Sequence, residues 1–368
     1  MKICFFIDDI THTGGIERVT SNLVSQFSQD RKDIEIDIVS QFKSSEKLWY
    51  PFEGSTIKYL SNKNYDAKPK SLERLTKLIS NVFTVRKYFK KNKYDLIIAQ
   101  SFPNVFILFL ASVDLSKVVA AEHTFYDYYG ETLKKVRLYI YKKCYKVAVL
   151  TPHDKKCFDS HFTTEHTVLI PNPVVVPEYS YSPLTNKQAI AMGRIQYAKG
   201  FDTLVDVFAM VYKKHPDWKV NIYGDGNYKD EIAQYITDKG MDGIVVLKGR
   251  TDDVPSVMRE SSFFILSSRF EGFGMVIAEA MAQGLPAVSF DCPTGPSVIV
   301  KTGINGILVE NQNKEALAEA ICYMIEHPIE RKEMGKRAVD TIKEFSGESI
   351  AQKWYKLFSE IYICKSTD

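Results

Sequence analysis

The chain has 368 residues, of which 45% are hydrophobic and 25% are charged. These ordinary globular values exclude long disorder, a collagen-like repeat and a coiled coil as the main content. At roughly 150 residues per domain, the length predicts two domains or one large one. The six cysteines include no C-x-x-C pair, so neither a disulfide framework nor a zinc ribbon is expected, and a reducing cytoplasm fits best.

No stretch of the sequence is apolar enough to span a bilayer. The most apolar run, Val105 to Val113, is far shorter than the roughly 20 residues that a spanning helix needs. The apolar run near Met1 is also too short for a signal peptide. We therefore expect a soluble or peripheral protein.

Charge divides the chain in two. Residues 1–172 hold 26 Lys and Arg against 19 Asp and Glu, whereas residues 173–368 hold 22 against 26. Two segments concentrate the positive charge: Lys70–Lys93 has eight basic residues and one acid, and Tyr126–Lys146 has six basic residues and six tyrosines. Each segment is either a helix face lying on an anionic membrane surface or a solvated helix whose apolar stripe belongs to the core. Nucleic-acid-binding motifs are absent and the net charge is only +3, so no nucleic acid partner is expected.

The first half of the chain alternates short apolar runs with helical stretches, which is the pattern of βα units in a parallel sheet. Strands are predicted at Ile3–Ile7, Ile36–Ser40, Ile57–Leu60, Leu96–Ala99, Val118–Ala121 and Val147–Leu150. Helices are predicted at Ile16–Ser28, Leu72–Lys91 and Thr132–Cys144.

A Pro-rich segment from Pro171 to Pro183 predicts a linker, and the alternation then restarts. The second half has predicted strands at Ala189–Met192, Val220–Tyr223, Val245–Leu247, Phe263–Leu266 and Ala287–Phe290. Its predicted helices are Phe201–Lys213, Tyr228–Lys239, Val276–Gln283, Lys314–Ile325 and, at the end, the amphipathic stretch Ser349–Cys364. We expect an α/β protein of two doubly wound, Rossmann-like domains, 1–172 and 173–348, with a ligand in a cleft between them beyond the carboxyl ends of the strands.

The most informative stretch follows the predicted strand Phe263–Leu266. Gly274, like Gly272, permits a tight loop, and a helix then begins near Met275 with unpaired N–H groups that favour a diphosphate. Glu279 lies inside this apolar helix, where either two ribose hydroxyls or a neighbouring Arg or Lys would satisfy its carboxylate. Because Glu271 precedes the helix, one acid would lie near a sugar and the other near a ribose, which describes a nucleotide-sugar site.

Two further loops follow predicted strands of the second half. In the loop from Gly193 to Gly200, the side chains of Arg194 and Lys199 either neutralise a diphosphate or form surface salt bridges. The pair Gly249-Arg250 ends another strand, where a base could meet backbone groups.

At these residues the chain resembles the retaining glycosyltransferases of family 4, which have the GT-B fold, and the resemblance runs over nearly the whole length. It rests on three elements. They are the E-x7-E element within EGFGMVIAEAMAQGLPAV (Glu271 to Glu279), the loop from Gly193 to Gly200, and the glycine pair within Thr13–Arg18.

The resemblance implies the donor-side roles. Glu271 would contact the hexose hydroxyls of the donor and Glu279 its ribose, while Arg194 and Lys199 would clamp the diphosphate. The backbone amides of the loop and helix start would add to this clamp, and they belong to Phe273, Gly274 and Met275.

On the first domain, the resemblance implies that Gly15 lets the backbone approach the donor phosphate or sugar. His123 follows a predicted strand, and its implied role is a hydrogen bond to the donor sugar near the reaction centre. His12 lies beside the glycine pair and could contact the acceptor. The family also often sends its C-terminal helix back to the first domain, which would explain Ser349–Cys364.

The implied reaction transfers a hexose or N-acetylhexosamine from a UDP-sugar to a lipid-linked saccharide with retention of configuration, in the biosynthesis of O-antigen, capsule or lipopolysaccharide. The enzyme would work in the cytoplasm, peripherally on the inner face of the cell membrane. No cofactor or metal is expected, because the sequence has no Asp-x-Asp motif and two cations plus a helix N-terminus would meet the developing negative charge.

Three alternatives stay open on this sequence. They are a GDP-mannose-dependent mannosyltransferase, a UDP-sugar epimerase of the same fold, and a non-catalytic sugar-nucleotide-binding partner. A two-domain NAD-dependent dehydrogenase is disfavoured, since no G-x-G-x-x-G follows the first strand with an acid about 20 residues further on.

Overall fold

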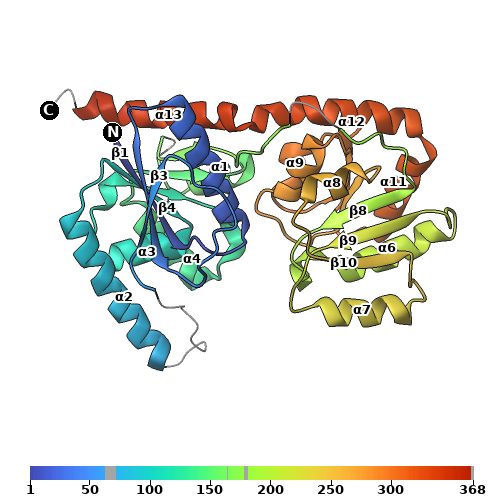
Figure 1. Ribbon diagram of the computed structural model, residues 1–368, viewed down its shortest axis with the longest axis horizontal. Helices are drawn as coiled ribbons and strands as arrows, with labels where there is room; N and C mark the ends of the chain where they lie inside the picture. Colours follow the sequence, from blue (N-terminus) through green and yellow to red (C-terminus); the bar gives the residue numbers. More distant parts are fainter. Residues whose placement is uncertain (63–71, 164, 178–180, 366–368) are drawn as a thin grey trace. The chain divides into compact units, whose positions relative to one another are not determined.

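A computed structural model describes residues 1–62, 72–163, 165–177 and 181–365 of the chain (Figure 1). The chain forms two compact units: unit 1 is Met1–Pro173 together with the segment from Gly347 onward, and unit 2 is Val174–Ser346. The first crossing between the units falls within the predicted linker, whose residues 178–180 lie outside the described part. Lys70 of the first basic segment also lies outside it.

Unit 1 is built on a seven-stranded sheet in the order β3-β2-β1-β4-β5-β6-β7, and every pairing in it is parallel. Its interior strand β1 is buried from Ile3 to Ile7, as expected for a strand covered on both faces. The strands are β1 (Lys2–Asp9), β2 (Glu35–Phe42), β3 (Ser55–Tyr59), β4 (Leu96–Gln100), β5 (Val118–Ala121), β6 (Lys146–Val149) and β7 (Thr167–Leu169).

Right-handed crossovers place helices on both faces of this sheet (Figure 1). Helix α1 packs against the C-terminal helix α13, whereas α3 packs against α2 and α4. The helices of unit 1 are α1 (Gly15–Asp30), α2 (Leu72–Lys91), α3 (Phe102–Leu110), α4 (Glu131–Tyr141), α5 (Pro152–Asp159) and α13 (Gly347–Lys365). The short elements α3, α5 and β7 were not predicted from the sequence, because α3 is apolar all round and the other two have only eight and three residues.

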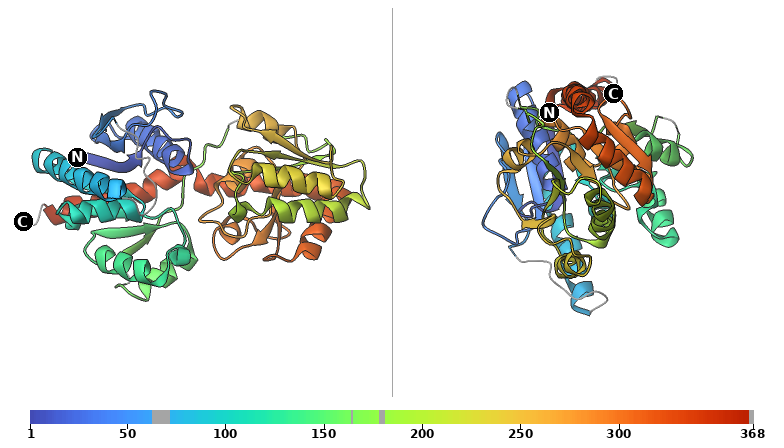
Figure 2. Two further views of the ribbon diagram at one scale, coloured as in Figure 1. Left: turned by 90° about the horizontal axis from the view of Figure 1, so that it is seen from below. Right: turned by 90° about the vertical axis from the view of Figure 1, so that its right-hand side faces the viewer.

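Unit 2 has a six-stranded parallel sheet in the order β10-β9-β8-β11-β12-β13. Helices α6, α7 and α11 lie on one face of it, and α8, α9, α10 and α12 lie on the other (Figure 2, left). Its strands are β8 (Gln188–Met192), β9 (Lys219–Tyr223), β10 (Val245–Gly249), β11 (Phe264–Leu266), β12 (Ala287–Asp291) and β13 (Gly306–Glu310). Its helices are α6 (Phe201–Tyr212), α7 (Lys229–Asp238), α8 (Val254–Arg259), α9 (Met275–Ala282), α10 (Pro296–Ile299), α11 (Lys314–Glu326) and α12 (Pro328–Ile342). Two doubly wound, Rossmann-like sheets were predicted, and the fold confirms them; β13, α8, α10 and α12 were missed.

Part of the second basic segment, Tyr126–Lys146, is buried, whereas about half of its residues are exposed. Arg137 is fully buried, with its Nη1 3.8 Å from Oε2 of Glu122, and Tyr141 is fully buried as well. Lys134 pairs within unit 1 with Asp127 at 2.8 Å. For these residues the interpretation as a membrane-facing stripe is wrong, because the tertiary fold gives them partners.

None of the helices in the described residues is both long and apolar enough to cross a membrane. Five cysteines are free thiols: Cys4, Cys144, Cys157, Cys292 and Cys322.

The C-terminal helix α13 contributes aromatic side chains to the core of unit 1. The ring of Phe358 lies 5.5 Å from that of Phe27 on α1 in an edge-on arrangement, and Tyr355 lies 5.3 Å from the same ring. Phe27 is fully buried, and Phe358 and its neighbour Trp354 are almost so. Unit 1 therefore includes a segment that is more than 170 residues distant in sequence from the rest of it.

We expect Phe358→Ala to lower the free energy of unfolding of unit 1 by about 3–5 kcal/mol, because it leaves a cavity against Phe27. Guanidinium unfolding of the full chain, followed by tryptophan fluorescence, measures this effect. Lys356→Ala on the exposed side of the same helix is the control and should leave the midpoint unchanged. Equal midpoints for the two variants would show that α13 does not stabilise unit 1.

Candidate active site

In unit 2, the loop after β8 and the loop after β11 are joined by hydrogen bonds. The Ser267 hydroxyl donates to the backbone oxygen of Lys199 at 3.0 Å, and the Arg269 amide donates to that of Ala198 at 2.8 Å. Gly200 has a positive φ of 60°, and a Cβ placed on it would lie 2.2 Å from the oxygen of Ser267. The close approach of the two loops therefore requires glycine at this position.

These loops bring together two of the predicted catalytic side chains. Nζ of Lys199 lies 2.5 Å from Oε1 of Glu271, and the Ser268 hydroxyl donates to the same oxygen at 2.7 Å. The Glu271 side chain is 9% exposed and that of Lys199 is 21% exposed. The second oxygen of Glu271, Oε2, has no hydrogen-bond partner among the described residues. One carboxylate oxygen is thus held by the protein, while the other can accept a hydroxyl of a ligand.

The glycine after Phe273 starts helix α9. Gly274 has a φ of 88°, which is the left-handed conformation that suits glycine, and no side chain caps the helix. The amide of Ile277 bonds to the oxygen of Gly274, which leaves the first amides, such as that of Met275, without intrahelical acceptors. Such a helix start attracts an anion.

The loop before α9, which contains Glu271 and Phe273, is also held by contacts with other parts of unit 2. Phe273 is buried, with its ring 5.6 Å from that of Phe345. The hydroxyl of Thr294 donates to the backbone oxygen of Glu271, and a Cβ on Gly295 would lie 2.8 Å from the backbone of Phe273. Glu279 lies about 6 Å along the axis of α9 from Met275, the first residue of the helix, and its side chain is partly exposed.

The other donor-side residues lie at neighbouring strand ends of the same sheet. The amide of Gly193 bonds to Tyr223 at the end of β9, and the amide of Gly224 bonds to Gly249 at the end of β10. Arg250 is exposed and lies 3.6 Å from Oδ2 of Asp225. Arg194 is exposed and forms no hydrogen bond or ion pair with any described residue, so no contact joins it to the pair of Lys199 and Glu271.

In unit 1, a cavity of about 520 Å³ opens at the carboxyl ends of β1, β2 and β4. His12 and Glu17 contribute to its wall, and a Cβ on Gly15 would meet open space. Sequence reasoning missed most of the lining, which includes the polar residues Asp8, Gln41, Asn81, Gln100, Asn104 and Thr124 and the aromatic residues Phe106, Tyr128 and Tyr129.

Four of these polar residues form a chain of amide groups along the cavity. Asn81 donates to Oε1 of Gln41 at 2.6 Å, Gln41 donates to Asn104, and Asn104 donates to the backbone oxygen of Gln100. Gln41 and Gln100 stand near the ends of apolar strands, and this position was the one signal in the sequence that could have indicated them. Such groups donate and accept hydrogen bonds, as sugar hydroxyls require.

His123 lies just after β5, beside this cavity. Its Nε2 is 2.6 Å from Oε1 of Gln100, so Nε2 carries the proton and Nδ1 can accept a hydrogen bond. Burial lowers the pKa of His123 to about 4, and the imidazole is therefore neutral at physiological pH. His12, by contrast, is exposed, with its Nε2 3.8 Å from Oδ2 of Asp9.

The cavity is acidic. The surrounding protein desolvates the carboxyl groups of Asp8 and Glu17 and raises the pKa of each. Among the described residues that line it, His12 is the one with a basic side chain. In the described part of the chain, no three His, Cys, Asp or Glu side chains are grouped as a metal site.

Comparisons with known proteins agree with this architecture. The chain matches the family model "Glycosyltransferase Family 4" over residues 13–176 and the model "Glycosyl transferases group 1" over residues 179–341. Together the two matches cover nearly all of the chain and correspond to units 1 and 2. The chain belongs to the GT-B glycosyltransferases, as the sequence analysis predicted.

Several curated relatives match over 96% of this chain, and two of them have a named product or substrate. One is the amylovoran biosynthesis glycosyltransferase AmsD of Erwinia amylovora, which is 28% identical, with 98% of its length covered. The other is a poly(ribitol-phosphate) alpha-N-acetylglucosaminyltransferase of Staphylococcus aureus, which is 29% identical, with 77% covered. Among solved structures, Anabaena HepE in complex with UDP and glucose superposes with a TM-score of 0.81 at 21% identity, covering 97% of this chain and 99% of HepE.

We expect the free energy of unfolding to depend on the titration of His123. The folded protein holds its pKa near 4, whereas the unfolded chain has the usual value of 6.5, so the unfolded chain binds more protons between these values. The contribution of neutral His123 is thus complete above pH 6.5 and is lost as the pH falls to 4. His123→Gln should remove this dependence, so that the difference in stability between wild type and variant shrinks on acidification. If the difference in the free energy of unfolding between wild type and His123→Gln stays constant from pH 7 to pH 4, the prediction is wrong.

Proposed function

We propose that the enzyme transfers a hexose or N-acetylhexosamine from a UDP-sugar to a lipid-linked saccharide, with retention of configuration. The observation that carries the proposal is the pair of Lys199 and Glu271 beside the uncapped start of α9 at Gly274. A cation and a helix N-terminus favour a diphosphate, and a carboxylate with one open oxygen favours a sugar hydroxyl. The complex of HepE with UDP and glucose supports this choice of donor.

The roles of the donor-side residues follow from charge. Cleavage of the bond between the anomeric carbon and the diphosphate builds negative charge on the leaving phosphate, which Lys199, Arg194 and the amides at Gly274 and Met275 stabilise. Oε2 of Glu271 binds the hexose, and Glu279 binds the ribose. Because these groups meet the charge themselves, we propose a reaction that needs no metal ion or other cofactor. Gly249 and Arg250 border the base.

In unit 1, His123 is the residue that we assign to the donor sugar. Its neutral imidazole keeps Nδ1 as an acceptor for a hydroxyl of the donor sugar, while Nε2 is held by Gln100. The space above Gly15 gives a ligand room to approach the backbone. His12 contacts the acceptor.

Two features support a saccharide acceptor in cell-surface polysaccharide biosynthesis. AmsD is named for the biosynthesis of amylovoran, and the aromatic and amide groups of the unit 1 cavity suit a sugar ring. We place the enzyme in the cytoplasm, peripheral to the inner face of the cell membrane, where a lipid-linked acceptor would lie. O-antigen, capsule and lipopolysaccharide are the candidate products.

The carboxylates of Asp8 and Glu17 indicate which charge the acceptor can carry. The described lining of this cavity has two acids and no Lys or Arg, which makes the entry of a phosphate unfavourable. We therefore propose that the sugar residue that accepts the transfer is uncharged, unlike the ribitol phosphate named for the Staphylococcus aureus relative.

The donor site predicts selective nucleotide binding. A ligand at 100 times its Kd stabilises a protein by about 2.7 kcal/mol, so UDP should raise the Tm, whereas ADP and NAD should not. The shift should persist in EDTA. Glu279→Ala should abolish the rise in Tm caused by UDP. Lys199→Ala should reduce this rise to a value that corresponds to at least about tenfold weaker binding of UDP.

Lys187→Ala is the matched control for this experiment. Lys187 also pairs with a carboxylate, that of Asp217, at 2.5 Å, but it precedes β8 at the opposite edge of the sheet and is 65% exposed. Its loss should leave the shift intact. If GDP and not UDP raises the Tm, the proposed donor becomes GDP-mannose. If no nucleotide raises the Tm, the proposed donor site is wrong.

The acidic cavity predicts discrimination by acceptor charge. At pH 7.5, kcat/KM for a neutral acceptor should exceed that for the same acceptor phosphorylated on its accepting residue by at least about tenfold. Because the pKa values of Asp8 and Glu17 are raised, the ratio should shrink as the pH falls toward those values and the acids become neutral. Asp8→Asn should reduce the ratio, whereas Asp33→Asn, on an exposed loop, should not. Equal use of both acceptors by the wild type would refute an uncharged acceptor.

A further inference from the structure

The imidazole of His123 is held by one protein group, the side chain of Gln100. Gln100 is the last residue of β4 and is 2% exposed, and His123 follows β5, the neighbouring strand of the sheet. The 2.6 Å contact between Oε1 of Gln100 and Nε2 is the one hydrogen bond that the ring forms with the described residues. The proton on Nε2 and the open lone pair on Nδ1 therefore both depend on Gln100.

The charge of the unit 1 cavity favours the orientation of the Gln100 amide. Gln100 lines this cavity, and its Nε2 forms no hydrogen bond with any described residue. Asp8 and Glu17 line the same cavity, and their carboxylates attract an N–H group and repel a carbonyl oxygen. With the nitrogen on the side of the cavity, the oxygen is left for His123, and the imidazole keeps its proton on Nε2.

The backbone beside Gln100 is strained and is held by hydrogen bonds. Ser101 has a φ of 71° and a ψ of 160°, a conformation that is costly for a residue with a Cβ. Its amide donates to the oxygen of Ala121 at 2.8 Å, and its own oxygen accepts from the amide of Asn104 at 3.2 Å. Such strain persists where the surrounding structure holds it, and it gathers at functional sites. The turn at Ser101 thus fixes the end of β4 against the end of β5, two residues before His123.

The chain of amide groups also fixes the backbone of Gln100. The backbone oxygen of Gln100 can only accept, so Asn104 must present its NH₂ group to it and its oxygen to Gln41. Gln41 must then donate with its own NH₂ group, and its oxygen accepts from Asn81 at 2.6 Å. One carbonyl oxygen therefore orients three side chains, from α3, β2 and α2, in a single direction.

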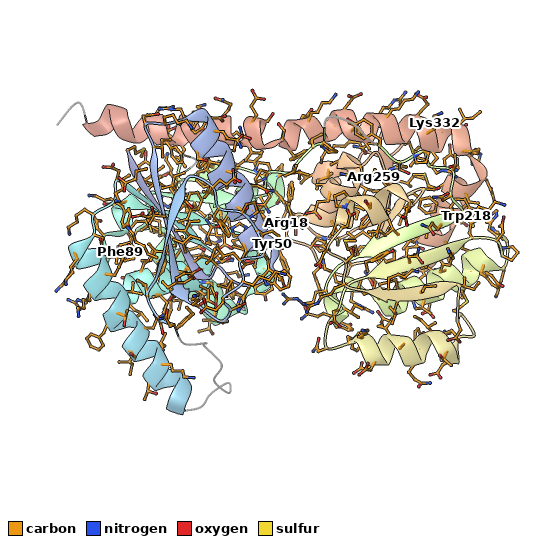
Figure 3. The ribbon with its side chains drawn as sticks, viewed as in Figure 1. Arg18, Tyr50, Phe89, Trp218, Arg259 and Lys332 are labelled. Carbon is orange, nitrogen blue, oxygen red and sulfur yellow. The ribbon has the colours of Figure 1, made fainter. Side chains whose placement is uncertain are left out.

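The far end of this amide chain is supported as well. Asn81 is buried on α2, and the same helix is held to the sheet by Phe89, which is buried and is labelled in Figure 3. The ring of Phe89 lies 5.6 Å from that of Phe6 in β1, in an edge-on arrangement. Gln100 and His123 are therefore in place before a ligand binds, which is what a positioned catalytic contact requires.

The charged groups around His123 do not take over the task of Gln100. They lie on β5, on α4 and in the wall of the cavity, and they are Glu122, Arg137, Asp8, Glu17 and His12. Glu122 accepts hydrogen bonds from the hydroxyls of Thr124, at 2.9 Å, and Tyr141. Burial, and no charged neighbour, lowers the pKa of His123 to about 4.

We propose that Gln100 is a positioning residue for the transfer, which holds His123 in the Nε2–H form so that Nδ1 stays open to a hydroxyl of the donor sugar. The opposite tautomer would present an N–H group on Nδ1 and could not accept from that hydroxyl. This role rests on the contact proposed between His123 and the donor sugar. The tautomer itself is a property of the free protein and can be measured without a substrate.

The first test is two-bond ¹H–¹⁵N NMR of the full chain, in which the signals of His123 are those that His123→Gln removes. In wild type, His123 should be in the Nε2–H form at pH 7.5. Gln100→Glu places a carboxylate beside the ring, which stabilises the imidazolium and should raise the pKa of His123 from about 4 toward its usual value of 6.5. Gln100→Leu accepts no hydrogen bond and should leave a mixture of tautomers. The control, Gln352→Glu at an exposed position of α13, should change neither property.

The second test is the release of UDP from UDP-glucose or UDP-N-acetylglucosamine. The rate of Gln100→Glu relative to wild type should fall by about tenfold between pH 8 and pH 5.5, because an imidazolium with a pKa near 6.5 has no lone pair on Nδ1. At pH 8 the ratio should return to within about twofold of one, since the glutamate then holds a neutral ring in the same tautomer. Gln100→Leu should be slower at every pH, and Gln352→Glu should match wild type.

An Nδ1–H form of His123 in wild type would overturn the proposal, as would a ratio for Gln100→Glu that does not change with pH. The rise in Tm caused by UDP separates this proposal from the transfer reaction. UDP carries no sugar, so the rise should be normal in both Gln100 variants. If wild type binds no nucleotide and releases no UDP from either donor, the proposed transfer fails, and the tautomer alone decides the role of Gln100.

Discussion

All strands in each sheet run in the same direction, and this constraint decides where a functional side chain can lie. Parallel strands bring their carboxyl ends to one edge, where the loops leave backbone groups and polar side chains beyond the sheet. In unit 2 this edge gathers Gly193, Lys199, Gly249 and Glu271 from three different strands. In unit 1 it gathers the walls of the cavity of about 520 Å³. The opposite edge of unit 1 remains available for a second, unrelated surface.

The two loops that carry Lys199 and Glu271 are ordered by short polar contacts within unit 2. Lys199 and Glu271 already pair at 2.5 Å, and Ser268 and the close approach at Gly200 fix the two loops that bear them. An ion pair this sheltered from solvent stabilises little by itself, since desolvation offsets much of the attraction. The ion pair instead fixes the positions of the Lys199 ammonium group and the Glu271 carboxylate, so that binding of the proposed donor needs little rearrangement.

Unit 1 separates its charges. The larger cavity, at the carboxyl ends of the strands, is lined by acids and amides, whereas the smaller cavity, at the amino ends, is lined by Arg86, Lys90, Lys93 and Lys117. Helix α2 runs from one to the other, with Leu78 at the first and Lys90 at the second. A single helix therefore borders two cavities of different charge.

The sequence by itself determined the two doubly wound sheets, because the alternation of apolar runs and helical periods is a local property of the chain. It also determined the loop and helix around Glu271 and Glu279, since glycines directly before a helical period indicate a tight loop at a helix start. Only the tertiary structure decided the amide chain from Asn81 to Gln100 and the burial of Arg137, which a basic, aromatic segment does not reveal. The fully buried guanidinium of Arg137 lies near the carboxylate of Glu122 and donates to the backbone oxygen of Tyr126, and folding brings these groups together. Contacts between residues far apart in sequence depend on how elements pack, and no local pattern of residues carries that information.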